Sequence, residues 1–295
     1  MKTPLRYAGG KSKAIKIITP YVQNVDRIIS PFFGGGSLEV HWASMGKEVI
    51  GFDIFNTLTN FWDVLINNRE ELVEKLKTIN PTPEEYKRIK DILIQWDETQ
   101  DLLSKWKTDH YKRDNIIQLD RITAAAYYYF NHNTSYGPGY LGWGSSVYLK
   151  QNKWDAMIDK ISKLRLPTLS VSQSSFEDVF SKYRDDFYYL DPPYYLEKDS
   201  DNKMFTGIYP MRNIPIHHNG FDHEKLRDLL LSHNGNFVLS YNNCETIREY
   251  YKDFELFYPK WNYSMGNGET RVGKNRLEMG ITNTKDSHEI LIVKR

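Results

Sequence analysis

The chain has 295 residues, of which 40% are hydrophobic, and its 39 Lys and Arg nearly balance its 38 Asp and Glu. This size permits one large domain or a domain with an insertion, and a single cysteine, Cys244, excludes an internal disulfide framework. Because we find no apolar run of about 18 residues and no secretory leader, we expect a cytoplasmic protein that neither spans a membrane nor is secreted.

Positive charge is concentrated near the two ends of the chain. No acid precedes Asp26, whereas several bases do: Lys2, Arg6, Lys11, Lys13 and Lys16. Near the other end, Glu269 stands alone among four bases: Lys260, Arg271, Lys274 and Arg276. They bracket an aromatic, glycine-rich segment at residues 261–273 that we expect to be an exposed loop. Such clusters are usually solvated surface, but these two are our candidate contacts to nucleic-acid phosphates.

The first predicted strand covers residues 26–30, and a glycine turn and a helix over residues 37–44 follow it. The turn contains Phe33, Gly34 and Gly36, and it leads to a helix start whose unpaired N–H groups favour an anion. A second strand at residues 48–52 ends on Asp53, 19 positions after Gly34. At about this spacing an acid reaches the hydroxyls of a nucleoside ribose.

The dinucleotide-binding fingerprint is incomplete, because Glu39 stands where its third glycine would be. A close approach of the helix to a pyrophosphate is therefore not expected, and nicotinamide-dependent redox chemistry is disfavoured. A smaller ligand with a ribose and a modest anionic tail fits better, and S-adenosylmethionine has both.

Residues from about 61 to 162 interrupt the alternation of strands and helices. They are helix-rich and charged, and an apolar run at residues 124–130 passes into a polar, aromatic turn region at residues 131–140. We interpret the stretch as an inserted helical subdomain. The alternative is a set of core helices with an irregular linker.

Strand and helix patterns resume after this interruption. A helix is predicted over residues 221–232, and strands are predicted at residues 168–173, 187–190, 236–240, 254–258 and 289–294. Strands that alternate with helices favour a parallel, doubly wound α/β sheet.

The strand at residues 187–190 leads into Asp-Pro-Pro-Tyr, the strongest functional signal in the sequence. Asp191 and the carbonyl of Pro192 offer two acceptors for a planar amino group, and Tyr194 offers a ring on which a base can stack. Pro192 and Pro193 fix φ at about −65° and so hold these groups in a rigid turn. The arrangement suits the exocyclic amine of a nucleobase, although Asp-Pro-Pro alone is also a common loop breaker.

Other chemistries are disfavoured. C5-cytosine methylation needs a cysteine nucleophile before the catalytic region, whereas Cys244 lies late in the chain. His217, His218 and His223 fit no common zinc spacing and have no cysteine partner, so we expect no metal site. No P-loop signature occurs.

Several short motifs, taken in order, resemble those of the Dam-like N6-adenine DNA methyltransferases over nearly the whole chain. Residues 7–11 resemble the family's N-terminal aromatic-x-Gly-Gly-Lys motif, residues 31–37 its glycine motif, and residues 53–56 its ribose-binding Asp-x-x-Asn. Further segments fall where related motifs occur: residues 175–178, 191–194, 205–206, 240–243 and 288–291.

The resemblance implies a Rossmann-like S-adenosylmethionine-dependent methyltransferase core with an inserted helical target-recognition subdomain. The catalytic domain would comprise residues 1–60 and 163–295, and the target-recognition domain residues 61–162. The implied reaction is methylation of N6 of an adenine flipped out of double-stranded DNA. Its catalytic residues would be Asp191, Pro192, Pro193 and Tyr194.

The resemblance also implies a set of contacts to S-adenosyl-L-methionine: Tyr7, Gly9, Gly10, Lys11, Phe33, Gly34, Gly36, Asp53, Ile54, Phe176 and Asp191. Among them, Lys11 would pair with the methionyl carboxylate, and Tyr7 would face the sulfonium. Asp53 would take the ribose hydroxyls, and Phe176 would stack on the adenine of the cofactor.

The expected DNA contacts are Asn131, Asn133, Ser135, Tyr136, Lys260, Arg271, Lys274 and Arg276. Family members that read GATC usually carry an arginine in a base-contacting hairpin, but no arginine occurs at residues 122–164. GATC is therefore one option among several. We expect a monomer or weak dimer, and a cognate restriction endonuclease is considered as a partner. Two alternatives stay open: methylation of cytosine N4 or RNA amines, and a catalytically silent DNA-binding relative.

Overall fold

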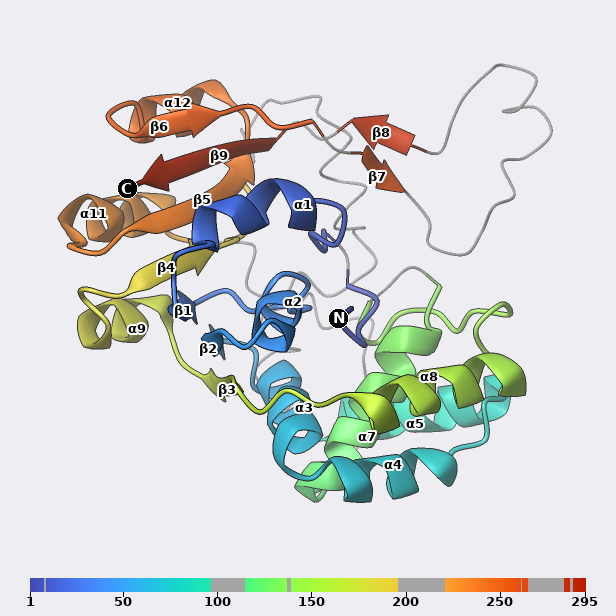
Figure 1. Cartoon of the computed structure of the whole chain (residues 1–295). Coiled ribbons are helices and arrows are strands. Elements are labelled where there is room, and N and C mark those ends of the chain that lie inside the picture. Colours follow the sequence, from blue (N-terminus) through green and yellow to red (C-terminus); the bar gives the residue numbers. More distant parts are fainter. Residues whose placement is uncertain are drawn as a thin grey trace, which may run out of the picture.

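A seven-stranded sheet in the order β3-β2-β1-β4-β5-β9-β6 organises the chain (Figure 1). The structure is a computed structural model that describes residues 1–7, 9–96, 115–136, 139–195, 221–260, 262–264, 284–286 and 289–295. The strands of the sheet are β1 (Arg27–Ser30), β2 (Glu48–Asp53), β3 (Leu169–Gln173), β4 (Phe187–Leu190), β5 (Phe237–Asn242), β6 (Glu255–Phe257) and β9 (Glu289–Lys294). A separate antiparallel pair comprises β7 (Asn262–Ser264) and β8 (Thr284–Asp286).

The described helices are α1 (Ile15–Ile18), the 3-10 helix η1 (Thr19–Val22), α2 (Glu39–Ser44), α3 (Asn56–Asn67), α4 (Arg69–Lys77), α5 (Pro83–Gln95), α7 (Arg121–Thr134), α8 (Gln151–Lys163), α9 (Phe176–Lys182), α11 (His223–Ser232) and α12 (Glu245–Tyr250). Within the described ranges, none of them combines the length and apolar character that crossing a bilayer requires.

Side chains alternate between two buried faces along the parallel strands, as the two-residue period of a strand requires. On β1, Ile28 joins a core shared with α1, α2 and α3, whereas Ile29 joins a second core shared with α9, α11 and α12. On β4, Tyr189 and Tyr188 divide between the same two cores. Helices thus cover both faces, and the predicted doubly wound α/β sheet is confirmed.

The predicted parallel arrangement holds for β1 to β5, but β9 runs antiparallel to both of its neighbours, β5 and β6. The connection from β6 to β9 contains the hairpin strands β7 and β8 rather than a described helix. The absence of a described crossover helix agrees with the antiparallel direction of β9, because only parallel neighbours need a long crossover connection.

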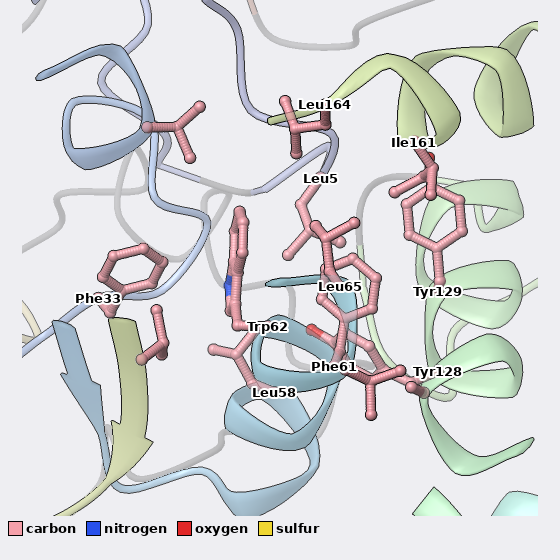
Figure 2. Packing of buried hydrophobic residues seen from close by; sticks show 14 of the residues in the cluster. Leu5, Phe33, Leu58, Phe61, Trp62, Leu65, Tyr128, Tyr129, Ile161 and Leu164 are labelled. Atoms are coloured by element: carbon pink, nitrogen blue, oxygen red, sulfur yellow. The ribbon is translucent and has the colours of Figure 1, made fainter. Parts of the chain in front are cut away.

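Helices α4, α5, α7 and α8 gather beside α3 at one side of the sheet (Figure 1). α3 packs on both β3 and α7, and Figure 2 shows its residues Phe61 and Trp62 between Phe33 and Tyr129. The rings of Phe61 and Tyr129 stack with centroids 5.3 Å apart. The helical character expected for residues 61–162 is present in the described part of that range, although residue 61 lies inside α3 and these helices share one hydrophobic core with the sheet.

Four of the described helices begin at a capping side chain, among them α5 at Thr82. Asp120, Ser175 and Asp222 each accept a hydrogen bond from the backbone N–H three residues further on, at the starts of α7, α9 and α11. Each such cap contributes about 1 kcal/mol. The N–H of Ser174 also donates to the carbonyl of Asp53 at 3.2 Å, so the start of α9, where Phe176 lies, is tied to the end of β2.

α7 extends further than the sequence predicts. A turn is expected from residue 131, but the helix continues to Thr134. The amide oxygens of Asn131 and Asn133 accept hydrogen bonds from the N–H groups of Leu141 at 2.7 Å and Arg6 at 2.8 Å. These long-range bonds hold the buried end of α7 in place and so override the low helix propensity of Asn and Thr.

Candidate active site

The turns that follow β1, β2 and β4 meet at one edge of the sheet, since these three strands are parallel neighbours. β1 lies between β2 and β4, so the chain winds away from β1 in both directions. Ligands of open α/β sheets bind at such a switch point. Gly34, Asp53 and Asp191 lie at this edge, so the fold brings the predicted glycine turn, ribose acid and catalytic acid together.

Lys11 lies at the centre of a buried polar cluster at this edge. Its side chain is 3% exposed, and its ammonium donates to the two carboxylate oxygens of Asp191 at 2.8 and 2.9 Å. It also donates to the hydroxyl of Tyr194 at 2.8 Å and to the carbonyl of Gly9 at 3.3 Å. Oε1 of Glu289 lies 3.6 Å from the same ammonium. One cation therefore joins the N-terminal motif to β9 and to the turn after β4 at residues 191–194, the predicted catalytic turn.

The electrostatic balance at Asp191 sets two effects against each other. Burial raises the pKa of its carboxyl, and the adjacent Lys11 ammonium opposes that rise. Burial also raises the pKa of Tyr189, on β4, well above its ordinary value, and the charge of Asp191 adds to this shift. In such a weakly solvated pocket a hydrogen bond to the charged carboxylate is stronger than in water.

The catalytic turn is fastened to β5. Asn242, the last residue of β5, accepts a hydrogen bond from the N–H of Tyr195 at 2.9 Å and donates to the carbonyl of Tyr195 at 2.8 Å. Pro192 and Pro193 restrict the backbone between Asp191 and this fastening. The sequence analysis places Asn242 in a family-like motif but does not predict its role as a clamp. The signal was its position at a strand end beside the catalytic strand.

Tyr194 is buried. Its side chain is 7% exposed, and its ring centroid lies 6.3 Å from that of Tyr241 and 5.1 Å from the Lys11 ammonium. Stacking of Tyr194 on a base therefore stays a prediction, and it requires that the ring become accessible when DNA binds.

Asp53 closes the glycine turn. Its two carboxylate oxygens accept hydrogen bonds from the N–H groups of Gly34 at 2.9 Å and Phe55 at 3.0 Å. Burial raises the pKa of this carboxyl, and the hydrogen bonds from the backbone oppose the rise. Each oxygen has a second lone pair, so Asp53 keeps the capacity to accept from hydroxyl groups. The next residue, Ile54, is 43% exposed.

The glycine turn needs glycine at two positions because of its backbone. Gly34 and Gly36 have φ values of 48° and 60°, in the left-handed region. Phe33, which precedes them, is buried, and its ring meets Trp62 edge-on with centroids 5.1 Å apart (Figure 2). Since the Phe33 side chain lies in the core, any contact of this residue with a cofactor has to come from its backbone.

Tyr7 lies between the glycine turn and α7. A Cβ atom added at Gly35 would come within 2.3 Å of the Tyr7 Cβ, so the N-terminal motif passes directly over the turn. The Tyr7 ring stacks on His132 with centroids 5.6 Å apart. Gly9 has a φ of 73°, and the N–H of Gly10 donates to the Tyr7 carbonyl at 3.2 Å. This tight turn directs Lys11 toward Asp191.

Three partly exposed phenylalanines gather at the same edge. Phe32 follows β1, Phe176 begins α9 and Phe221 precedes α11, with ring centroids 5.3 to 5.7 Å apart. Their faces and edges suit a planar heterocycle. A role was predicted for Phe176 but not for Phe32 or Phe221, although for Phe32 an aromatic residue in the turn after a strand was a usable signal.

Three of the predicted DNA contacts are buried. Asn131, Asn133 and Ser135 are 0% exposed, and their side-chain oxygens bond to backbone groups. In this structure they order the chain around the end of α7. Tyr136, at 60% exposure, and Lys260 lie at the surface. The remaining predicted contacts lie outside the described residues: Arg271, Lys274 and Arg276.

Glu39, which replaces the third glycine of the fingerprint, is buried and accepts a hydrogen bond from the Ser30 hydroxyl at 2.9 Å. Burial raises the pKa of its carboxyl from 4.5 to about 7. The neutral carboxyl therefore stabilises the fold fully below pH 4.5, and this contribution is lost as the pH rises toward about 7. By the size of the shift, the loss is at most about 3 kcal/mol.

We expect Glu39→Gln to flatten the dependence of stability on pH between about pH 5 and pH 8, because glutamine does not ionise. Urea unfolding at these two pH values gives the free energy of unfolding at each, and the difference between them is the pH dependence of stability. Glu48→Gln, at an exposed position on β2, is the matched control and should keep the wild-type slope. An unchanged slope in the Glu39 variant would contradict the assignment.

Comparison with known proteins agrees with this geometry. A family model described as D12 class N6 adenine-specific DNA methyltransferase matches residues 7–265. Over 220 residues, 72% of its length, the chain is 23% identical to the modification methylase StsI of Streptococcus sanguinis, and it spans about a third of that relative (32%). Among solved structures, the precorrin 8W decarboxylase of Methanobacterium thermoautotrophicum is 10% identical, with a TM-score of 0.33 over 95% of this chain and 87% of that one.

Proposed function

Because the chain belongs to the D12 class of N6 adenine-specific DNA methyltransferases, we propose that it methylates the exocyclic amine of specific adenines in double-stranded DNA. The family implies a methyl donor and a DNA substrate. The observation that carries the proposal is Asp191, whose side chain is 25% exposed and is held by the buried Lys11 at the switch point of the sheet.

We propose S-adenosyl-L-methionine as the methyl donor, and the residues at the switch point fit it. Asp53 keeps acceptor capacity for the ribose hydroxyls, and the partly exposed rings of Phe32, Phe176 and Phe221 offer a surface for adenine. When bound, this cofactor supplies a methyl group on a sulfonium for in-line transfer to nitrogen.

Lys11 has a different proposed role from the one that the sequence suggests. Its ammonium already bonds Asp191 and lies near Glu289. A third carboxylate, from the cofactor, would add negative charge to a buried cluster in which two carboxylates already share one cation. We therefore assign Lys11 to the organisation of Asp191 rather than to the carboxylate of the cofactor.

The chemistry follows from the acceptors of the catalytic turn. The adenine amine is a poor nucleophile because its lone pair is delocalised into the ring. Asp191 and the Pro192 carbonyl would accept its two protons in hydrogen bonds, favour sp³ geometry and aim the lone pair at the methyl group. Such positioning can supply roughly 7–11 kcal/mol of the barrier.

The target base must leave the duplex, which costs a few kcal/mol. Stacking on Tyr194 would return about 1–3 kcal/mol, and phosphate contacts would supply the rest. In the proposed division of labour, residues 61–162 recognise the DNA sequence, and residues 1–60 and 163–295 carry out the transfer. We propose a monomer or weak dimer; the name of the StsI relative, a modification methylase, supports a cognate restriction endonuclease as a partner.

DNA binding should weaken steeply with salt, because bound Lys and Arg release counterions from the phosphates. The candidate bases are the exposed Lys2, Lys13 and Lys16 near the N-terminus, together with Lys260, Arg271, Lys274 and Arg276. Lys11 is not among them, because it is buried and paired with Asp191. A titration of a labelled duplex between about 50 and 200 mM salt measures the slope. Equal affinity at both ends of this range would refute the phosphate contacts.

The proposed function is tested with purified protein, S-adenosylmethionine and unmethylated genomic DNA. Mass spectrometry of the digested product should show N6-methyladenine, and sequencing of the modified DNA should show one recognised site. N4-methylcytosine as the product, or methylated RNA alone, would replace the proposal with one of its alternatives. DNA binding without any methylated product would indicate a silent relative.

A further inference from the structure

Glu289 is a buried carboxylate to which the proposed reaction gives no role. It begins β9 and is 3% exposed, whereas the four residues after it are buried and apolar: Ile290, Leu291, Ile292 and Val293. Burying a carboxylate costs several kcal/mol unless a positive partner offsets the loss of water. The Lys11 ammonium, 3.6 Å from Oε1 of Glu289, is such a partner.

Strand register brings Glu289 to the catalytic turn. β9 pairs with β5 so that Glu289 lies opposite Asn242, the residue that clamps the backbone of Tyr195. The carboxylate therefore belongs to the same edge as Asp191. A slip of one residue would turn Glu289 to the other face of the sheet, and the register is fixed by the buried residues that follow.

The hydrogen bonds of Lys11 show what Glu289 can do. An ammonium has three protons, and those of Lys11 serve Asp191, the Tyr194 hydroxyl and the Gly9 carbonyl. At 3.6 Å, Glu289 is beyond hydrogen-bond distance but within ion-pair distance. When a substrate amine donates to Asp191, it competes with Lys11 for the same oxygens. Glu289, the second carboxylate beside Lys11, can then accept the Lys11 N–H that Asp191 no longer accepts.

We propose that Glu289 is a positioning residue, which holds the Lys11 ammonium in place while Asp191 turns an oxygen toward the target amine. This inference rests on the proposed function. Without Glu289, Lys11 has Asp191 as its carboxylate partner and keeps both oxygens of Asp191 occupied. With Glu289, the cation is shared between two carboxylates, and Asp191 remains charged but available.

The groups that face Asp191 come from several elements. Lys11 belongs to the N-terminal motif, Tyr194 to the turn after β4 and Glu289 to β9, while Glu39, whose pKa the charge of Asp191 helps to raise, belongs to α2. Protonation of Asp191 would remove an acceptor, so the acid limb of the kcat profile reports its state.

The test compares wild type with Glu289→Gln, which removes the charge and keeps the shape. We expect kcat to fall roughly 10- to 100-fold, as for a misplaced catalytic group, while KM for DNA changes less than about threefold. The acid limb of the kcat profile should move to lower pH, because the undivided charge of Lys11 favours ionised Asp191. Glu289→Asp, which keeps the charge on a shorter side chain, should recover part of kcat.

Glu255→Gln is the matched control. This carboxylate lies on the neighbouring strand β6, also 3.6 Å from a cation, Arg295, but it is half exposed. We expect its kcat, pH profile and thermal unfolding to equal those of wild type. A third readout needs no activity: in the free protein, the stability losses from Lys11→Met and Glu289→Gln should be less than additive in the double variant, because both break one pair.

The outcomes separate the two proposals. A folded wild type that methylates no DNA removes the proposed function. An active wild type together with a Glu289→Gln variant of equal kcat and unshifted pH profile overturns the role of Glu289 alone, as do additive stability losses in the free protein. If Glu289→Gln does not fold, Glu289→Asp decides in its place, and a wild-type kcat and pH profile in that variant overturn the inference.

Discussion

Asp191→Ala is expected to lower kcat for adenine methylation by about a thousandfold or more while changing affinity for DNA less than about threefold. The carboxylate is the acceptor that we assign to the target amine, and it is partly buried, so such a hydrogen bond is stronger there than in water. DNA affinity comes mainly from phosphate contacts, which are not made by this carboxylate. Single-turnover transfer of a labelled methyl group, together with a duplex-binding titration, measures the two effects separately.

Asp185→Asn is the matched control for this experiment. Asp185 precedes the same strand, β4, at its opposite end, and its exposed side chain accepts a hydrogen bond from Asn234 at 2.9 Å. The control should methylate at the wild-type rate. A turnover of the Asp191 variant close to that of the control would remove Asp191 from the mechanism. Loss of DNA binding in parallel with activity would point to a structural role.

Gly36→Ala is expected to destabilise the fold by about 2–5 kcal/mol. About 1–2 kcal/mol comes from the left-handed backbone, at a φ of 60°, and about 1–3 kcal/mol from overpacking. The added Cβ would lie 2.7 Å from the Phe33 ring and 3.2 Å from Trp62. Phe33 cannot yield easily, because a Cβ at Gly51, on its other side, would lie 2.1 Å from the same ring.

Gly46→Ala separates the cost of the left-handed backbone from the cost of overpacking. Gly46 also has a positive φ, of 90°, but no atom lies within 4 Å of the position of its Cβ. This control should therefore lose about 1–2 kcal/mol for the backbone alone. Urea unfolding of both variants measures the difference. Equal losses would mean that the Phe33 ring is not held between the two glycines as described.

The strands of the sheet could be predicted closely, because most parallel strands contain a short apolar run and end at a polar or turn-forming residue, whereas β3 alternates apolar and polar residues. Residues 187–190 and 289–294 match β4 and β9 in full. The direction of β9 could not be predicted, since a buried strand reads alike in either direction. Likewise, the last turn of α7 depends on bonds between Asn133 and Arg6, which lie 127 residues apart.

The candidate site was predictable in its parts but not in its contacts. Motif order identified Lys11, Asp53 and Asp191, and the fold places all three at one edge of the sheet. Local sequence gives no signal that Lys11 bonds to Asp191, 180 residues away, or that Glu289 lies beside it. The burial of Asn131 and Asn133 was also hidden, since asparagine in an apparent turn usually lies at the surface.

The place of β9 between β5 and β6 has a consequence for the synthesis of the protein. β9 follows every other strand along the chain, yet it inserts between two strands that are made earlier. β6 ends at Phe257 and β9 begins at Glu289, 32 residues later, so at about 5–20 residues per second β9 follows β6, the later of its two neighbours, by roughly 2 to 6 seconds. During that interval the edges of β5 and β6 that β9 will pair with are unpaired. We therefore expect chaperones to bind the chain before β9 inserts, and methylation of cellular DNA to begin only after it has inserted.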